Sequence, residues 1–190
     1  MNPDKFNRVE IASEQALWDW LAANHAQEDS VWLVTWKAQH TDRYVSREAV
    51  LDALIAHGWI DGRRLKLDDT RTMQLISPRN QQAWARSYKY RAARLAAEGR
   101  MHAAGDASVA AGKASGKWNL SDPVDALIDP DDLIQGLDQR HARTWWQSSA
   151  PSYRRNILRW IAAAKKPATR EKRIIIVAEH AAKCQKVPQY

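Results

Sequence analysis

The segment 59–67 places a carboxylate where apolar side chains are expected. Strict alternation along a strand puts Asp61 on the same face as Trp59 and Leu65. A partly buried charge needs a partner, which can be Arg63 on the same face or Arg79 at the end of the paired strand. The favoured interpretation is a structural ion pair that pins the hairpin to a helix, and the other is a pocket for a small anionic ligand or a peptide.

The second interpretation defines a candidate ligand site. In such a site the arginines supply positive charge, a tryptophan supplies a stacking surface, and a glycine lets a ligand approach the backbone closely. The candidate ligand-binding residues are Trp59, Asp61, Gly62, Arg64, Arg79 and Trp84. The partner expected there is a small anion or a peptide.

A cluster of basic residues forms a second candidate site. Residues 151–173 include eight basic residues and one acidic residue, and such a cluster attracts polyanions such as nucleic acid. The candidate polyanion-binding residues are Arg154, Arg155, Arg159, Lys165, Lys166 and Arg170. The preceding segment 121–138 carries six aspartates and no basic residue. Neutralisation within the chain is therefore favoured over binding of nucleic acid or an anionic membrane.

Other site chemistries find no support in the residue types and spacings. The six histidines show neither H-x-x-x-H nor H-E-x-x-H spacing, so no metal site is expected. No glycine-rich phosphate loop occurs, so no nucleotide cofactor is expected either. The single cysteine, Cys184, continues the apolar face of a helical pattern and is expected to be a buried, unreactive thiol. We predict no catalytic residue, no cofactor and no membrane span, and a lone thiol fits a cytoplasmic location.

Helices and strands alternate along the first hundred residues. Serine N-caps, glycine stops and a 3.6-residue period predict helices over about 14–25, 47–57, 84–98 and 102–115. Runs of β-branched and aromatic residues predict strands over 31–36, 59–67 and 70–76. The last two strands are expected to pair as a hairpin, because Asp68 and Asp69 can form the turn between them.

The remaining residues are helical in pattern. Helices are expected after Pro130, around Trp145 and after Pro151, and a last helix is expected over 174–184. The predicted domains are an α+β domain at 1–118, an acidic linker at 119–129 and a helical module at 130–190. The predicted fold class is therefore α+β, with a small antiparallel sheet and packed helices in the N-terminal part, followed by a helical C-terminal module. The composition, 45% hydrophobic and 27% charged over 190 residues, is that of a globular protein.

Several separate motifs resemble the bacterial YdeI/OmpD-associated, or bacteriocin-protection, family. In the first half these are His57-Gly58-Trp59-Ile60-Asp61-Gly62-Arg63-Arg64, Lys66-Leu67-Asp68, Ser77-Pro78-Arg79 with Trp84, and Glu98-Gly99-Arg100-Met101. In the second half they are Pro151-Ser152-Tyr153-Arg154, Arg159-Trp160-Ile161 and the run from Thr169 to Ile174. Together the similar segments extend from about residue 17 to 182. The resemblance implies a cytoplasmic bacterial protein linked to bacteriocin protection or tolerance of antimicrobial peptides, with no established reaction or cofactor.

The residues and the resemblance together predict a non-catalytic cytoplasmic binding or stress-tolerance protein. The alternative function is nucleic-acid or other polyanion binding through the basic C-terminal helices. Neither the identity of the ligand nor the oligomeric state follows from the residues.

Overall fold

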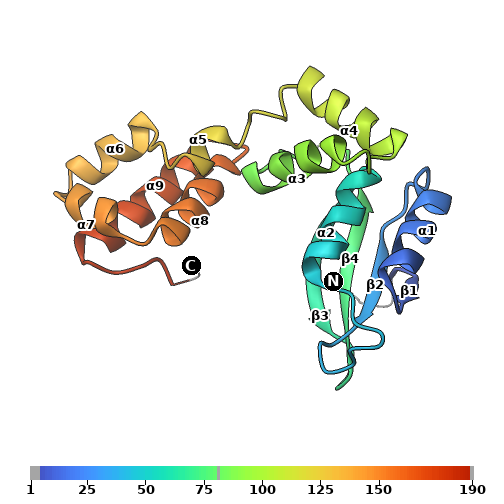
Figure 1. The fold of residues 1–190 in the computed structure, drawn as a ribbon. Helices are drawn as coiled ribbons and strands as arrows, with labels where there is room; N and C mark the ends of the chain where they lie inside the picture. Colours follow the sequence, from blue (N-terminus) through green and yellow to red (C-terminus); the bar gives the residue numbers. More distant parts are fainter. Residues whose placement is uncertain (1–4, 81, 189–190) are drawn as a thin grey trace. The chain divides into compact units, whose positions relative to one another are not determined.

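The computed structural model describes residues 5–80 and 82–188. Residues 1–4, 81 and 189–190, which include the outer ends of both predicted domains, lie outside the described part. The chain divides into two compact units, residues 1–120 and residues 121–190 (Figure 1). Most of the segment predicted as an acidic linker, 119–129, therefore falls within the second unit.

Within the described residues, a four-stranded mixed sheet organises the N-terminal unit, with the strand order β1-β2-β4-β3. The strands are β1 (Arg8–Ile11), β2 (Val31–Trp36), β3 (Trp59–Lys66) and β4 (Arg71–Pro78). The β3–β4 pair forms the predicted antiparallel hairpin, β2 also pairs antiparallel with β4, and the unpredicted β1 runs parallel to β2. The predicted α+β fold class is confirmed, and the sheet is mixed because β1 runs parallel to its neighbour.

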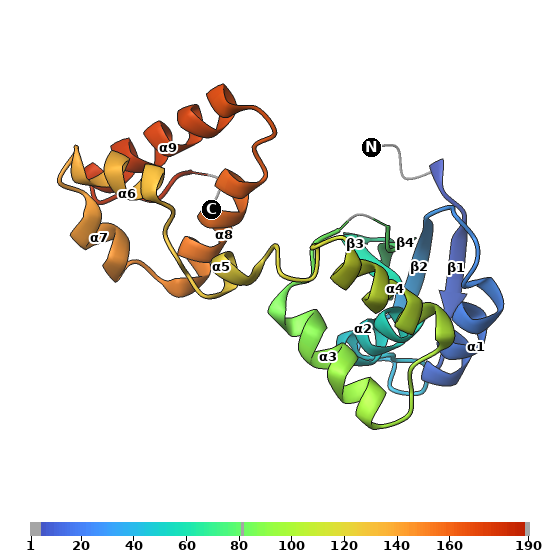
Figure 2. The same cartoon turned by 90° about the horizontal axis from the view of Figure 1, so that it is seen from above.

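The helices of this unit follow the predicted caps and lie beside the sheet. They are α1 (Glu14–Asn24), α2 (Arg47–Ala56), α3 (Arg86–Ala97) and α4 (Ala103–Ala114). Ser13 and Ser46 cap α1 and α2, because each serine Oγ accepts a backbone N–H three residues later at 3.1 Å. Figure 2 shows α1 and α2 along one face of the sheet, and Figure 1 shows α3 and α4 above the upper end of α2.

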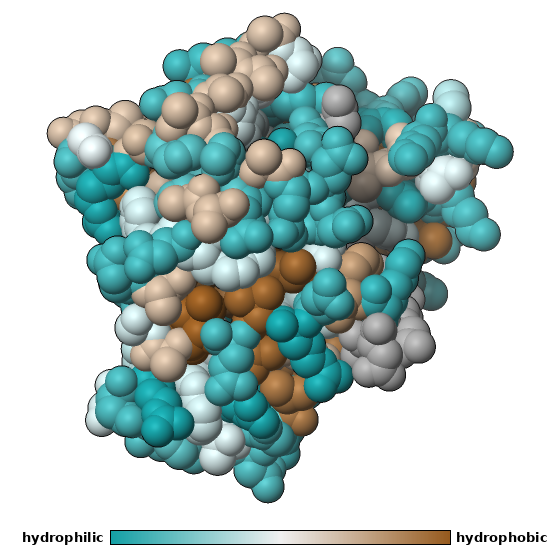
Figure 3. Space-filling view, turned by 90° about the vertical axis from the view of Figure 1, so that its right-hand side faces the viewer, coloured by the Kyte–Doolittle hydropathy of each residue, from teal (hydrophilic) through white to brown (hydrophobic). Residues whose placement is uncertain are grey.

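Apolar side chains gather on both faces of the sheet. On the helix-covered face, Leu33, Trp59 and Ile76 pack with the buried leucines of α1 and α2. On the opposite face, Trp32 and Met73 are buried among partly buried apolar neighbours. The side view in Figure 3 shows one group of apolar side chains surrounded by hydrophilic ones. The core of the unit therefore lies mainly between the sheet and its helices.

A β-bulge interrupts the alternation of side chains along β3. Asp61 pairs with Ile76, but Arg64 pairs with Gln74, so the register shifts between Asp61 and Arg64. Leu65 then packs with the cluster of the opposite face, while Trp59 stays on the helix-covered face. The expectation that Trp59, Asp61 and Leu65 share a face is wrong, because one extra residue in a strand reverses every later side chain.

The C-terminal unit is helical. Its helices are α5 (Asp122–Asp125), α6 (Asp131–Asp138), α7 (Arg143–Ser148), α8 (Pro151–Ala162) and α9 (Pro167–Ala182). Pro151 and Pro167 occupy the first turns of α8 and α9, where a missing N–H costs nothing. Trp146, Tyr153 and Val177 belong to the apolar core that these helices enclose.

Cys184 differs from its predicted environment. It lies beyond the end of α9 with a φ of 55°, and it is exposed. The helical apolar pattern does not continue to this residue, because the chain leaves the helix at Ala182. The prediction of a buried thiol is wrong.

Candidate functional site

A pocket of about 660 Å³ opens in the N-terminal unit where four segments meet. These are the turn after α1, the C-terminal end of α2, the end of β4 and one face of α4. The lining residues are His25, Ala26, Gln27, Glu28, His57, Gly58, Pro78, Arg79, Asn80, Ala104, Ala107, Ser108 and Ala111. The α4 residues recur at helical spacing, so a single face of α4 forms one wall.

Gly58 allows α4 to approach the end of α2 closely enough to form this wall. Its φ is 76°, and a Cβ at this position would lie 2.8 Å from the backbone oxygen of Ala104. The backbone N–H of His102, the N-cap residue of α4, donates to the Ala56 oxygen at 3.0 Å. The left-handed glycine that ends α2 therefore also sets the position of the pocket wall.

Arg79 is the permanent cation of this pocket, and its guanidinium is buried. The residue is 9% exposed, and its guanidinium lies 4.1 Å from the ring centroid of Trp84 and 5.0 Å from that of Tyr88. One Nη1–H donates to the Ala83 oxygen at 3.3 Å. Within residues 5–80 and 82–188, its Nε and Nη2 have no hydrogen-bond partner. Burial lowers the pKa of Arg79, although Tyr88 and Asp61 partly oppose that shift.

Asp61 lies close enough for its charge to raise the pKa of Arg79, but its carboxylate binds other groups. Its carboxylate accepts the Tyr88 hydroxyl in a short hydrogen bond and the side-chain amide of Gln74 at 3.1 Å. Burial, and then the Asp61 hydrogen bond, raise the pKa of Tyr88. Among the described residues, no arginine lies within ion-pair distance of Asp61. The partly buried carboxylate is thus bound by neutral donors, so the favoured structural ion pair with an arginine is wrong. Among the described residues, the Arg79 guanidinium keeps two unpaired N–H groups.

A stack of three histidines borders the pocket. The rings of His57 and His102 are 5.1 Å apart and nearly parallel, and His25 contacts His102 at 4.7 Å. The Nδ1 of His57 is 2.8 Å from the Ala53 oxygen, so this nitrogen carries the proton and donates it. Burial lowers the pKa of His57, and the neighbouring His102 and His25 lower it further. His57 is therefore neutral at pH 7.

The neutral state of His57 predicts a loss of stability on acidification. The unfolded chain protonates this imidazole below about pH 6.5, while the folded state resists protonation, so the free energy of unfolding falls as the pH drops through this range. We expect the melting temperature to be lower at about pH 5.5 than at about pH 7.5, and this difference to shrink in His57→Asn. Thermal unfolding followed by circular dichroism measures both. The exposed His141 provides the control, and an undiminished pH difference in His57→Asn would contradict the assignment.

The structure brings together only part of the candidate ligand set. Asp61, Arg79 and Trp84 lie in one polar and aromatic cluster, and only Arg79 lines the pocket. Trp84 is 1% exposed, and its ring lies against Gly112 and 5.0 Å from the ring of Trp118. Trp84 thus stacks on the guanidinium and not on an open surface.

The other three candidates lie elsewhere in the fold. Trp59 is fully buried and meets Trp20 edge-to-face at 5.7 Å. Gly62 sits in the bulge, where a Cβ would be 3.2 Å from the Leu75 oxygen. Arg64 lines a different, smaller pocket. Ligand binding by the predicted set of six stays a prediction.

Sequence reasoning missed His57, Asn80 and Ser108 as pocket residues. Ser108 stands in an alanine-rich helix, and its Oγ is buried without a partner among the described residues. The repeat of small residues at 104, 107, 108 and 111 was the available signal, because a small-residue face leaves space beside a helix.

The basic cluster of the C-terminal unit is largely paired with the acidic segment before it. The pairs are Arg154 with Asp129 at 2.8 Å, Arg155 and Arg159 with Asp125 at 3.9 and 3.1 Å, and Arg170 with Asp132 at 2.6 Å. Lys165 and Lys166 are exposed between α8 and α9. For these four arginines the structure shows the pairing within the chain that the charge pattern favoured. Polyanion binding by the cluster stays a prediction.

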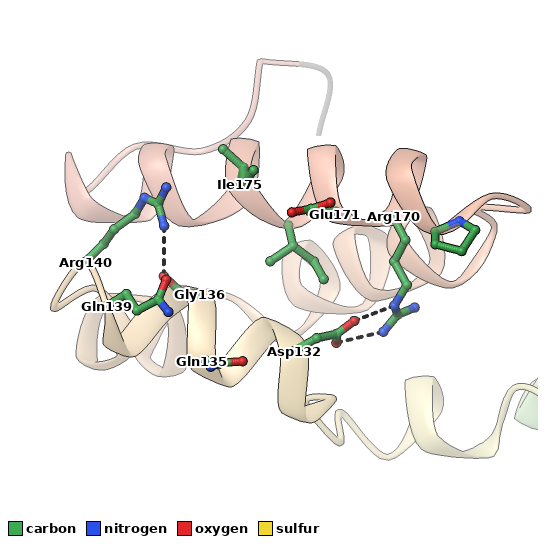
Figure 4. A pocket seen from close by; sticks show the side chains of 10 residues that line it. Asp132, Gln135, Gly136, Gln139, Arg140, Arg170, Glu171 and Ile175 are labelled. Carbon is green, nitrogen blue, oxygen red and sulfur yellow. Dashed lines mark hydrogen bonds and ion pairs between the residues drawn. The ribbon is translucent and has the colours of Figure 1, made fainter.

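A groove of about 500 Å³ runs between α6 and α9 (Figure 4). Asp132 and Arg170 form a two-point ion pair across it, and Arg140 donates to the Gly136 oxygen at 3.5 Å. Within the described part of the chain, this groove contains no buried unpaired charge of the kind that Arg79 presents. The N-terminal pocket is therefore the stronger candidate site.

Neither a membrane-spanning helix nor a metal-binding cluster is found among the described residues. No helix among them is both long and apolar enough to cross a membrane. No group of metal-ligating side chains among them could hold a metal ion.

Comparison with known families also divides the chain into two parts, and the boundary between the two structural units lies between the two matched regions. Residues 126–183 match the family model described as "Bacteriocin-protection, YdeI or OmpD-Associated", which confirms the family resemblance predicted from the motifs. Residues 9–108 match another model, described as "Domain of unknown function (DUF8412)", and the motifs at 57–64 and 98–101 fall within it. No curated protein and no solved structure matches the chain. The chain thus belongs to the DUF8412 family over more than half its length, and its C-terminal unit carries a bacteriocin-protection, YdeI or OmpD-associated domain.

Proposed function

We propose that this protein is a non-catalytic, cytoplasmic binding protein of the bacteriocin-protection type that holds a small carboxylate ligand in the Arg79 pocket. The observation that carries this proposal is a buried guanidinium with two unpaired N–H groups beside a pocket of ligand size. Unsatisfied buried donors are rare in native proteins, and an unpaired buried charge is costly. An anion bound at Arg79 would remove both costs.

A carboxylate fits this pocket better than a phosphate. The Nε and Nη2 groups lie on one edge of the guanidinium and can donate two parallel hydrogen bonds to one carboxylate. The rest of the lining adds no permanent cation, and His57 is neutral, so a dianion would keep an uncompensated charge. The one acidic lining residue, Glu28, is exposed, where solvent screens its repulsion.

One wall of the pocket, the face of α4, offers apolar contacts to a ligand, whereas much of the remaining lining is polar. Ala104, Ala107 and Ala111 contribute methyl groups from α4, while the unpaired Ser108 Oγ can hydrogen-bond a polar substituent. The volume of the pocket lies within the range of about 300–1,000 Å³ that is typical of small-molecule sites. The expected ligand is an organic acid larger than acetate.

Titration with acetate, butyrate and benzoate tests this function. We expect saturable binding by calorimetry, strongest for benzoate, and at least about tenfold weaker binding in Arg79→Lys, because lysine has no two-point edge. Arg63→Lys is the matched control, since Arg63 is an exposed strand arginine outside the pocket lining. Ser108→Ala tests the same wall without removing a charge.

Two outcomes would overturn the proposal. One is the absence of binding of all three acids to the wild-type protein. The other is equal affinity in wild type and in folded Arg79→Lys, with folding checked by circular dichroism.

Polyanion binding is the less favoured function. Four of its six candidate residues already pair with aspartates, and Arg154 is largely buried.

The cytoplasmic location is supported by the single thiol, which has no second cysteine in this chain with which to form a disulfide.

A further inference from the structure

A second pocket, of about 220 Å³, lies at the opposite end of α2 from the Arg79 pocket. It is built where β2 ends, where α2 begins and where the middle of β3 passes the start of β4, at the lower end of the sheet in Figure 1. The lining residues are Thr35, Trp36, Lys37, Ala38, Tyr44, Val45, Arg47, Arg64 and Thr72. None of these is acidic, and three are permanent cations.

The two arginines of this pocket differ from most others in the unit. Arg43, Arg71, Arg91, Arg94 and Arg100 each form an ion pair with a carboxylate. Within residues 5–80 and 82–188, neither Arg47 nor Arg64 has an ion pair or a side-chain hydrogen bond. Like charges that face one empty space repel each other, so their common pocket is suited to an anion.

The backbone sets the positions from which these cations project, and the side chains of Arg47 and Arg64 are exposed. The β3 bulge turns Arg64 to the helix-covered face, opposite Gln74, and bulges commonly re-aim a side chain beside a site. Arg47 is the first residue of α2, after the Ser46 cap. The ammonium of Lys37 donates to the backbone oxygens of Asp68 and Asp69 at 3.1 and 2.8 Å, which fixes its charge at the rim.

Hydrogen-bonding groups line the pocket as well. Thr35 is 3% exposed, and its Oγ1 lies 3.4 Å from that of Thr72, which is at the long limit for a hydrogen bond. The indole Nε1 of Trp36 is buried with no partner in the described part of the chain. The N-terminus of α2 adds the positive end of a helix dipole, which favours an anion nearby.

We propose that Lys37, Arg47 and Arg64 form a binding site for a phosphate group. Three permanent cations match a dianion, in contrast to the single cation of the Arg79 pocket. The volume is below the range of about 300–1,000 Å³ that is typical of sites enclosing a whole ligand. The pocket thus holds one phosphate group, either free or at the end of a phosphomonoester whose remainder stays outside.

Calorimetric titration of the full chain with inorganic phosphate and with phenyl phosphate tests this site. We expect saturable binding that weakens about tenfold or more in Arg47→Gln and in Arg64→Gln. Arg63→Gln is the matched control, because the neighbouring arginine of the same strand does not line the pocket, and it should keep wild-type affinity within about twofold. Tighter binding of phenyl phosphate identifies a phosphomonoester, and equal binding identifies free phosphate; both support the site.

Two results would overturn this proposal. One is the absence of saturable phosphate binding to the wild-type protein at millimolar concentrations. The other is an equal loss of affinity in Arg63→Gln and Arg64→Gln, which would indicate a nonspecific effect of net charge. Arg79→Lys separates this site from the carboxylate pocket, since it should leave phosphate affinity unchanged.

Discussion

Replacing Gly105 with alanine is expected to destabilise the N-terminal unit strongly, although alanine is the better helix former. A Cβ at this position of α4 would lie 2.1 Å from the backbone oxygen of Ala56 and 2.7 Å from its carbonyl carbon. These atoms belong to the end of α2, and the same oxygen accepts the N–H of His102. Neither helix can move aside without breaking that hydrogen bond.

The magnitudes decide the direction of this effect. Overpacking of a core costs about 1–3 kcal/mol and more where backbone must shift, whereas alanine gains at most about 1 kcal/mol of helix propensity over glycine. We therefore expect Gly105→Ala to lose at least about 2 kcal/mol of unfolding free energy. Urea titration followed by circular dichroism measures this loss.

Ala110→Ser is the control for Gly105→Ala. It also adds one heavy atom to α4, but on the exposed side, and is expected to change stability by no more than about 0.5 kcal/mol. A rise in stability in Gly105→Ala would mean that propensity outweighs packing, and the close contact of α4 with α2 would then be wrong. Because α4 also forms the wall of the Arg79 pocket, the same variant should lose carboxylate binding.

The second large effect is expected in the C-terminal unit, in Arg154→Met. Arg154 and Asp129 form an ion pair at 2.8 Å with side chains only 15% and 12% exposed, and Arg154 also donates to the Leu127 oxygen at 3.3 Å. Methionine keeps much of the side-chain length but leaves a buried carboxylate without its partner. Breaking such a pair costs about 3–5 kcal/mol, and hydrogen exchange of the α8 and α9 amides should report the loss.

Two further variants establish the cause of this loss. Arg143→Met breaks the exposed pair with Asp138, at 3.2 Å, and is expected to cost no more than about 1 kcal/mol. Adding Asp129→Asn to Arg154→Met removes the unpaired charge and should restore part of the stability. If the exposed and buried variants lost equal stability, burial of the Arg154 pair would not be the cause.

Much of the local structure could be predicted because it depends on neighbouring residues. Ser13 and Ser46 cap helices through a hydroxyl that reaches backbone three residues later, and Gly58 ends α2 because glycine tolerates a positive φ. The ion pairs of the C-terminal unit could also be predicted from residues that lie close together in the sequence. Six aspartates close in sequence to eight basic residues predicted pairing within the chain, and the structure contains four such pairs.

The parts that could not be predicted depend on contacts between distant segments. The strand β1 has four residues, too few for a clear alternation of side chains. It forms because it pairs with β2, the strand that follows α1 in the sequence. The bulge in β3 has only Gly62 as a local marker, and a glycine within a strand does not by itself establish a register shift, yet the bulge moves Leu65 to the opposite face and directs Arg64 to the smaller pocket. The sequence had placed Arg64 and Arg79 in one site, whereas in the structure they line two pockets at opposite ends of α2.

By itself, then, the sequence determined the α+β class, the helical C-terminal unit, the family and the two charged segments that pair. Tertiary structure alone decided which side chains meet. The Arg79 pocket combines residues from β4, α2, α4 and the turn after α1, and the unpaired state of the guanidinium depends on where Asp61 finds its donors. The physical reason is that helix caps and periodicity act within a few residues, whereas burial and the satisfaction of buried charge depend on every segment that packs around a group.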